Sequence, residues 1–154
     1  MYTLNCKGKI LTIDRPLVMG IINVTPDSFY ESEGNVAVDS IVEKAAKMIA
    51  EGASILDIGG QSTRPGSERL NATAELDRVL PVIAAIHKQL PKSIISVDTY
   101  HAAVAREAIL AGAFMVNDVS GGNLDREMLQ TVSAMQVPYV CMHMQGEPGT
   151  MQQN

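Results

Sequence analysis

The sequence predicts an α/β fold built on a parallel β-sheet, and three observations lead to that prediction. Short apolar runs recur along the 154-residue chain, stretches with helical spacing separate them, and each run ends in a cluster of small polar residues. Buried parallel strands are typically continuous apolar runs. A regular alternation of strand and helix indicates βαβ units, so we expect the strands to point the same way.

The strands and an amino-terminal hairpin can be placed from the apolar runs. Residues 2–14 predict a short hairpin, because Lys7-Gly8 separates two short segments of strand-forming residues. We expect this hairpin to cover the end of the sheet opposite the polar clusters. The five predicted strands of the sheet lie at 18–22, 55–58, 94–97, 114–116 and 139–142.

Four helices are expected between these strands. Their apolar residues recur every three or four positions at about 38–49, 76–86, 100–110 and 124–135. Asn71 or Thr73 is a candidate N-cap of the second helix, and Asn123 of the fourth. Pro81 falls inside the second helix and is expected to kink or interrupt it.

Composition excludes several classes of function. The net charge is −5 without a strongly charged block, so nucleic acid and anionic membranes are not expected partners. No run approaches the ~20 apolar residues of a membrane span, and no signal peptide is apparent, so a cytoplasmic protein is expected. Cys6 and Cys141 are far apart, and we expect reduced core thiols rather than a disulfide.

The polar clusters suggest one shared site, because ligands of parallel sheets gather at the carboxyl ends of the strands. Ser62, Thr63 and Arg64 offer two hydroxyls and a guanidinium, which suit a phosphate or diphosphate. A polar turn with an exposed arginine would account for them equally well.

Asparagine and aspartate side chains close three of the strands. Asn23 offers a carbonyl oxygen that suits Mg²⁺, although an asparagine at a strand end often only caps a turn. Asp98 follows a buried strand, where its carboxylate needs a donor-rich heterocycle or a developing cation as partner; a helix cap is the alternative. Asn117 has both a donor and an acceptor with which to recognise a ring edge. His143 is the one histidine placed near these strand ends, while His87 and His101 are expected on the surface.

The number of strands leaves two architectures open. Five strands could form a self-contained open sheet, or the first five strands of an eight-stranded barrel, which typically needs about 250 residues.

Taken together, these clusters resemble the dihydropteroate synthase family. The resemblance covers essentially the whole chain and depends on the segments Asn23 to Phe29, Gly59 to Gly66, Ser96 to Thr99, Asn117 to Gly122 and Met142 to Gly146. It implies a partial TIM (β/α)8 barrel of the pterin-binding type within one domain, 1–154. Residues 1–15 would form the hairpin and 16–154 the first five strand-helix units.

The resemblance also implies a reaction and a set of site residues. The family condenses 6-hydroxymethyl-7,8-dihydropterin diphosphate with 4-aminobenzoate and releases diphosphate, in folate biosynthesis. By analogy Asn23 would hold Mg²⁺, while Ser62, Thr63 and Arg64 would bind the diphosphate. The pterin ring would lie against Asp98, Asn117, Val119 and Met142, with Asp98 and Asn23 as the catalytic pair. A homodimer is expected.

This chain departs from the family pattern at some positions. Gln61 stands where many members have glutamate. The family also uses an aspartate, a lysine and an Arg-x-His pair from strands six to eight, and these have no counterpart in this sequence.

Two other functions remain open. An open five-stranded sheet would leave a strand edge exposed, which suits a non-catalytic, self-associating barrel fragment. A pterin-dependent methyltransferase could share the barrel, but the cluster from Ser62 to Gly66 favours a family that uses diphosphate.

Overall fold

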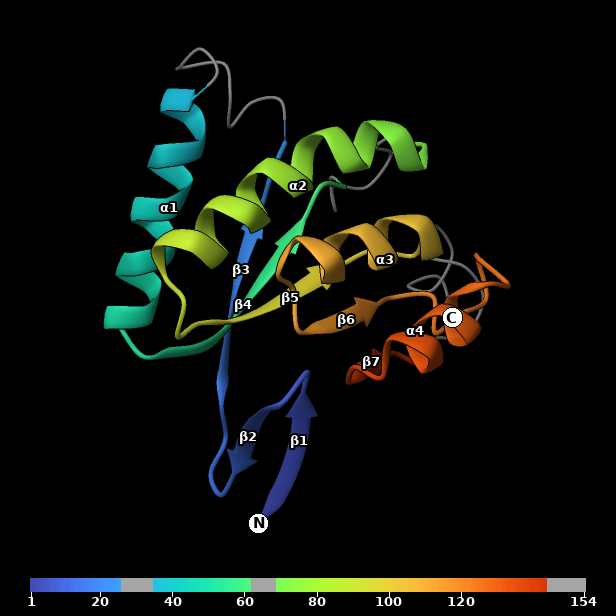
Figure 1. Cartoon of the computed structure of the whole chain (residues 1–154), viewed down its shortest axis with the longest axis horizontal. Coiled ribbons are helices and arrows are strands. Elements are labelled where there is room, and N and C mark those ends of the chain that lie inside the picture. The colour runs from blue at the N-terminus through green and yellow to red at the C-terminus, as the bar shows by residue number, and fades with distance from the viewer. Residues whose placement is uncertain (26–34, 62–68, 144–154) are drawn as a thin grey trace, which may run out of the picture.

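In the part of the chain that the structure describes, five parallel strands form the central sheet, and their spatial order β3-β4-β5-β6-β7 is their order in the chain (Figure 1). The structure is a computed structural model and describes residues 1–25, 35–61 and 69–143. The prediction of five parallel strands is therefore confirmed. The strands are β3 (Val18–Asn23), β4 (Ala53–Gly59), β5 (Ile94–Asp98), β6 (Met115–Asp118) and β7 (Tyr139–Cys141).

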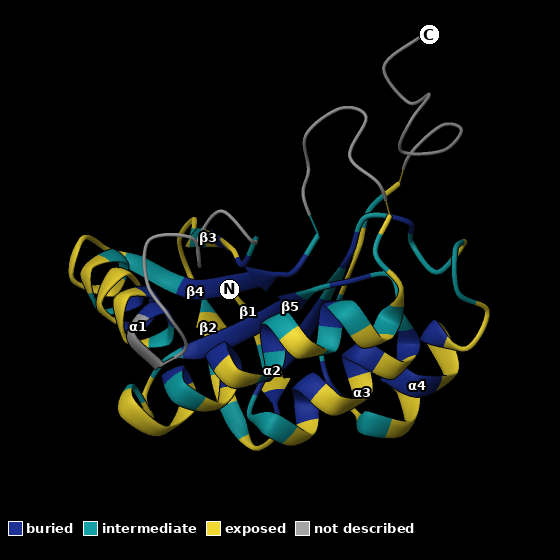
Figure 2. Ribbon diagram, turned by 90° about the horizontal axis from the view of Figure 1, so that it is seen from above, coloured by how far each residue is buried: buried dark blue, intermediate teal, exposed yellow. Residues whose placement is uncertain are grey.

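The helices pack against one face of the sheet (Figure 2). They are α1 (Asn35–Ala50), α2 (Ala72–Gln89), α3 (Ala102–Ala111) and α4 (Met128–Met135). Alternate strand residues such as Leu56, Ile58, Ile95 and Val97 point toward the helices and form the main core. No helix in the described part of the chain is long and apolar enough to cross a membrane.

The structure tests the predicted N-caps of α2 and α4 and the expected effect of Pro81. The helix α2 runs without interruption through Pro81, whose ring is exposed. The Asn71 side chain accepts a hydrogen bond of 2.9 Å from the backbone N–H of Ala74, which confirms it as the N-cap. The helix α4 begins only at Met128, so Asn123 is not its cap; the Asn123 amide donates instead to the Ser120 carbonyl.

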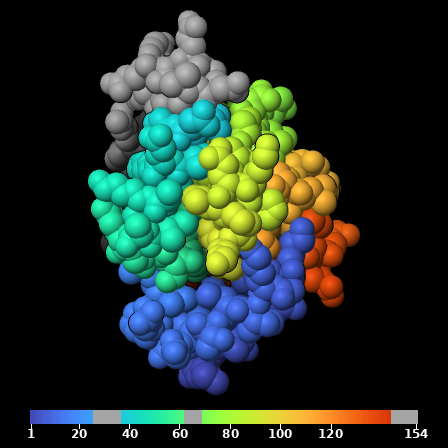
Figure 3. Space-filling model, turned by 60° about the vertical axis from the view of Figure 1, so that its left-hand side comes forward, coloured from blue at the N-terminus to red at the C-terminus, as the bar shows by residue number. Residues whose placement is uncertain are grey.

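The predicted hairpin is confirmed, and it lies beyond the amino-terminal ends of the strands (Figure 1). In Figure 3 the amino-terminal residues, in blue, form one end of the molecule. The hairpin consists of β1 (Tyr2–Cys6) and β2 (Lys9–Ile13), and its buried Cys6 belongs to a second apolar cluster with Ile55, Ile94 and Met115. Lys9 fastens it further, because its Nζ lies 2.6 Å from the Pro91 carbonyl and 4.2 Å from the centre of the Phe114 ring.

The two cysteines are free thiols, as expected, but only one is buried. Cys141 was predicted to lie in the core and is exposed, because β7 is a short strand at the edge of the described sheet.

The face of the sheet away from the helices is partly open. Ile21 of β3 is 60% exposed and Val140 of β7 is 40% exposed, and within the described residues each of these strands pairs with one neighbour only. This inner face carries the side chains that the sequence singled out.

Candidate functional site

The register of the sheet brings the predicted strand-end residues into one row. Asn23, Gly59, Asp98 and Asn117 are successive Cα partners across β3, β4, β5 and β6. Residues two positions earlier on these strands point the same way, since strand side chains alternate between the faces. Three of the predicted site residues therefore lie side by side at the carboxyl ends of the strands.

Gly59 leaves a space between its two neighbours in this row. A Cβ atom at this position would lie 3.4 Å from Asp98 Oδ2 and 3.6 Å from Asn23 Oδ1. Both side chains are thus close to the Gly59 backbone, and an added methyl group would occupy the space between their oxygens.

Asp57 is a site residue that the sequence analysis missed. It lies one layer below Gly59 on β4, is 3% exposed, and its Oδ2 accepts a hydrogen bond of 3.0 Å from the Asn117 side-chain amide. Its Oδ1 is buried without a hydrogen-bond partner, as is Oγ of Ser96, its register partner on β5. The signal was present as the single charged residue within the apolar run 55–58.

These unpartnered oxygens indicate what the site would bind. Buried polar atoms normally have hydrogen-bond partners, and a carboxylate oxygen can only accept. A ligand with several N–H donors would satisfy them.

Acidic side chains gather around Asp98 and change its titration. Burial, followed by the nearby charges of Asp57, Glu75 and Asp118, raises the pKa of Asp98 from its ordinary value of 3.8 to about 7. A carboxyl group with such a pKa exchanges its proton near neutral pH, which is typical of functional sites.

The residues that frame the segment between 61 and 70 form a second cluster beside the row. Gln61 Oε1 accepts hydrogen bonds from the Leu70 backbone N–H at 2.9 Å and from the Tyr100 hydroxyl at 3.3 Å. Both ends of the segment are thereby tied to the turn after β5. The predicted diphosphate ligands Ser62, Thr63 and Arg64 lie outside the described residues.

His101 is not the surface residue that was predicted. Its ring is half-buried, with Nε2 3.0 Å from the Leu70 carbonyl oxygen and 3.8 Å from Oε2 of the fully buried Glu75. Desolvation raises the pKa of Glu75. His87 is exposed, as expected, and so is His143, which lies beyond the end of β7.

Val119 and Met142 are half-buried and lie on connected segments. The Met142 backbone N–H donates to the carbonyl oxygen of Asp118, the residue before Val119, at 3.3 Å. The loop after β6 and the end of β7 are therefore in contact at the edge of the row.

The described residues include no cluster of three or more His, Cys, Asp or Glu side chains that could hold a metal ion. A metal at this site would have to bind through fewer protein ligands. The exposed carbonyl oxygen of Asn23 suits Mg²⁺, which prefers oxygen ligands and usually keeps several waters.

Comparisons with known proteins agree with this geometry. A family model described as pterin binding enzyme matches residues 19–154. The dihydropteroate synthase of Synechocystis sp. is 45% identical over 138 residues, which cover 90% of this chain and 47% of that protein. The mitochondrial folate synthesis bifunctional protein of Pisum sativum is 49% identical over 140 residues, covering 90% and 27% respectively.

Solved structures show the same similarity in three dimensions. The dihydropteroate synthase of Xanthomonas albilineans with 4-aminobenzoic acid superposes with a TM-score of 0.85 at 46% identity, covering 94% of this chain and 52% of that one. The complex of the Xanthomonas albilineans enzyme with 7,8-dihydropteroate gives a TM-score of 0.80 at 42% identity, with the same coverage. The chain spans about half the length of these dihydropteroate synthases.

Proposed function

Because this chain belongs to the pterin-binding enzyme family, we propose that it supplies the pterin-binding face of a dihydropteroate synthase. The reaction joins 6-hydroxymethyl-7,8-dihydropterin diphosphate to 4-aminobenzoate and releases diphosphate. The observation that carries the proposal is the row of Asn23, Gly59, Asp98 and Asn117 above the buried Asp57.

The pterin ring matches the acceptors of this row. Its aminopyrimidinone edge presents a ring N–H and an exocyclic amine side by side, which a carboxylate can accept together. Asp98 and the unpartnered Oδ1 of Asp57 provide such acceptors, and the bond from Asn117 to Asp57 fixes the orientation of the Asn117 amide. We assign Val119 and Met142 to apolar contacts with the ring, as the family resemblance implies.

The diphosphate and its metal belong at the adjacent end of the row. Asn23 would hold Mg²⁺, and the bound ion would supply charge neutralisation for the diphosphate leaving group. Ser62, Thr63 and Arg64 would contact the diphosphate oxygens through their hydroxyls and guanidinium. The hydrogen bond from Tyr100 to Gln61 supports this assignment, because Gln61 directly precedes Ser62 and Tyr100 follows Asp98 by two residues.

The chemistry requires stabilisation of positive charge at the pterin methylene group. As the bond between this carbon and the diphosphate oxygen breaks, positive charge develops on the carbon and the ring. The carboxylates of Asp57 and Asp98 would stabilise that charge in a partly dehydrated site. The 4-aminobenzoate nitrogen then forms the new C–N bond and loses one proton.

Titration calorimetry with 6-hydroxymethyl-7,8-dihydropterin tests this function. Wild-type protein is expected to bind the pterin, and Asp98→Asn is expected to weaken binding at least about tenfold. Asp39→Asn makes the same change of charge at an exposed position of α1 and is the matched control. Failure of the wild-type chain to bind the pterin, or equal binding by Asp98→Asn, would overturn the proposal.

A self-associating protein is the second candidate, and the homodimer predicted from the sequence fits it. The strands β3 and β7 are the edges of the described sheet, so each has one edge without a neighbouring strand there. Their exposed apolar residues Ile21 and Val140 also support association. Sedimentation velocity over a range of concentrations tests this, and a monomer at every concentration would contradict it.

A further inference from the structure

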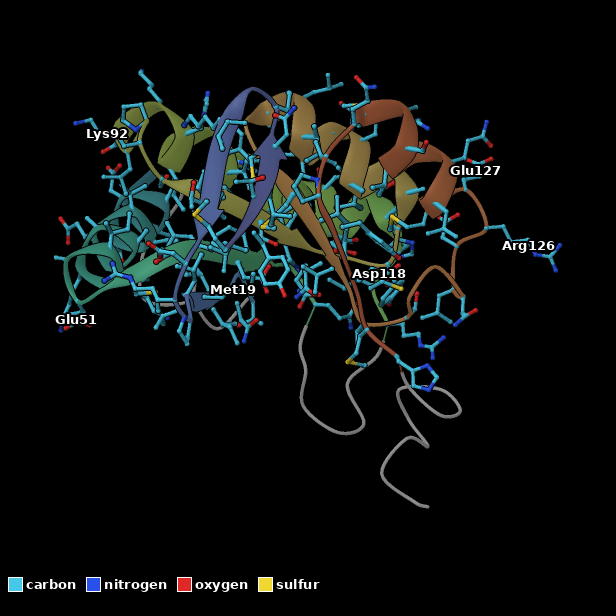
Figure 4. The ribbon with its side chains drawn as sticks, turned by 90° about the horizontal axis from the view of Figure 1, so that it is seen from below. Met19, Glu51, Lys92, Asp118, Arg126 and Glu127 are labelled. Carbon is cyan, nitrogen blue, oxygen red and sulfur yellow. The ribbon has the colours of Figure 1, made fainter. Side chains whose placement is uncertain are left out.

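Asp118 is a buried carboxylate that the proposed chemistry does not use. It is the last residue of β6, and in Figure 4 it lies in the interior of the view, between Glu51 and Lys92 on one side and Arg126 and Glu127 on the other. It is 0% exposed, and its side chain lies on the opposite face of the strand from Asn117. It therefore lies behind the row of site residues rather than within it.

Four donors converge on this carboxylate, two on each oxygen. Oδ1 accepts from the backbone N–H of Ser120 at 2.8 Å and from the Ser120 hydroxyl at 2.7 Å. Oδ2 accepts from the backbone N–H of Gly122 at 2.9 Å and from the Tyr139 hydroxyl at 2.7 Å. Burial, followed by the hydrogen bond to Asp118 and the charge of that carboxylate, raises the pKa of the Tyr139 phenol.

These bonds, together with a backbone bond of the neighbouring Asn117, join three segments of the proposed pterin site. The loop after β6 winds around the carboxylate with Gly121 and Gly122 at positive φ, and a Cβ on Gly121 would lie 2.8 Å from the Met142 carbonyl oxygen. Tyr139 belongs to β7, so the bond to its hydroxyl holds that strand. The adjacent Asn117 carbonyl accepts from the Thr99 N–H at 3.0 Å, which connects the same peptide to the end of β5.

We propose that Asp118 is a positioning residue for pterin binding, which orients Asn117 and Val119 and holds Met142 beside them. This inference rests on the proposed function and adds a residue that has no contact with the ligand. Val119 and Asn117 flank Asp118 in the chain, and Met142 donates its backbone N–H to the Asp118 carbonyl. The Asp118 side chain thus holds the loop after β6 and the strand β7, while its backbone carbonyl holds Met142.

A carboxylate is required here, and an amide of the same shape cannot replace it. The hydroxyls of Ser120 and Tyr139 can rotate and accept from an amide NH2 group. The backbone N–H groups of Ser120 and Gly122 cannot, and they point at different oxygens of Asp118. Asp118→Asn therefore leaves one of these buried N–H groups facing another donor, and the loop has to shift.

Amide hydrogen exchange followed by NMR tests the positioning without any ligand. In Asp118→Asn we expect exchange at the Ser120 or Gly122 amide to accelerate about tenfold or more. We also expect the side-chain NH2 resonances of Asn117 to move, because its bond to Asp57 is disturbed. Asp39→Asn is the control for the change of charge and should leave all of these signals in place.

Calorimetry with 6-hydroxymethyl-7,8-dihydropterin tests the consequence for binding. Asp118→Asn is expected to bind about tenfold more weakly or worse. Ser120→Ala keeps both backbone donors and is expected to stay within about threefold of wild type. Binding by Asp118→Asn at wild-type affinity, or unmoved Asn117 side-chain signals, would overturn the inference.

Tyr139→Phe keeps the test decisive if Asp118→Asn does not fold. It removes only the hydroxyl donor, and it should accelerate exchange at the Met142 amide and weaken pterin binding a few-fold. The inference would be overturned if Tyr139→Phe changed neither the exchange rate of the Met142 amide nor the affinity for the pterin. Absence of pterin binding by the wild-type chain would instead refute the proposed function, and the Asn117 signals would then decide the positioning role alone.

Discussion

Replacement of Asp98 by asparagine should stabilise the folded protein at alkaline pH while it weakens pterin binding. Burial and the charges of Asp57, Glu75 and Asp118 raise the pKa of Asp98 to about 7, against an ordinary value of 3.8. The folded state therefore favours the protonated carboxyl. The cost of ionising it appears as the pH rises above 3.8 and is complete above about pH 7.

The size of this effect follows from the two pKa values. The difference between a pKa of 3.8 in the unfolded chain and about 7 in the folded protein corresponds to about 4 kcal/mol of folding free energy. Asp98 is partly exposed at the end of β5, so solvent screening lowers the expected gain to about 2–4 kcal/mol at pH 8. At pH 4.5 the folded carboxyl is already neutral, and the gain should fall to about 1 kcal/mol.

Urea unfolding of wild type and Asp98→Asn measures the gain in the free energy of unfolding at pH 8 and at pH 4.5. Asp39→Asn, an exposed site on α1, should change the free energy of unfolding by less than about 0.5 kcal/mol at either pH. If Asp98→Asn is no more stable than wild type at pH 8, or if its gain is the same at both pH values, then burial and repulsion do not disfavour the ionised Asp98 carboxylate.

Three further substitutions test other parts of the structure. Gly59→Ala should weaken pterin binding about tenfold in calorimetry, because the new methyl group would lie 3.4 Å from Asp98 Oδ2; unchanged affinity would contradict the space assigned to the ligand. Ser96→Ala removes a buried hydroxyl without a partner, so urea unfolding should show equal or up to about 1 kcal/mol greater stability, and a clear loss would reveal a missed hydrogen bond. Lys9→Met should cost about 1–2 kcal/mol by removing the contact with Phe114 and a hydrogen bond, with no change in pterin binding at the far end of the sheet.

Most of the secondary structure could be predicted because its signals are local. The apolar runs and the helical periodicity lie within a dozen residues, so the five strands, the four helices and the hairpin follow from them. The errors arise where a distant partner decides. The helix α3 starts at Ala102, whose backbone N–H donates to Asp125 from 23 positions away. Asn123 is an exception, because its amide donates to Ser120 only three positions earlier rather than capping a helix.

The candidate site was only partly predictable. Asn23, Asp98 and Asn117 could be identified because each follows an apolar run, and parallel strands bring their carboxyl ends together. Asp57 was missed, and Asp118 was identified only as part of the polar cluster after Asn117, since the direction of each side chain depends on the pairing of the strands. His101 was misplaced for a related reason: the contact with Leu70 that half-buries it spans 31 positions.

The sequence by itself determined the strand-helix order, the polar residues at the strand ends and the resemblance to a folate-synthesis family. These properties depend on residue type and short spacing. The tertiary structure decided which oxygens lie unpartnered beneath the site, which aspartates face it and which lies behind it, and why the pKa of Asp98 is raised. Those properties depend on burial and on charges carried by different strands and helices, which only the packed sheet brings within a few ångströms.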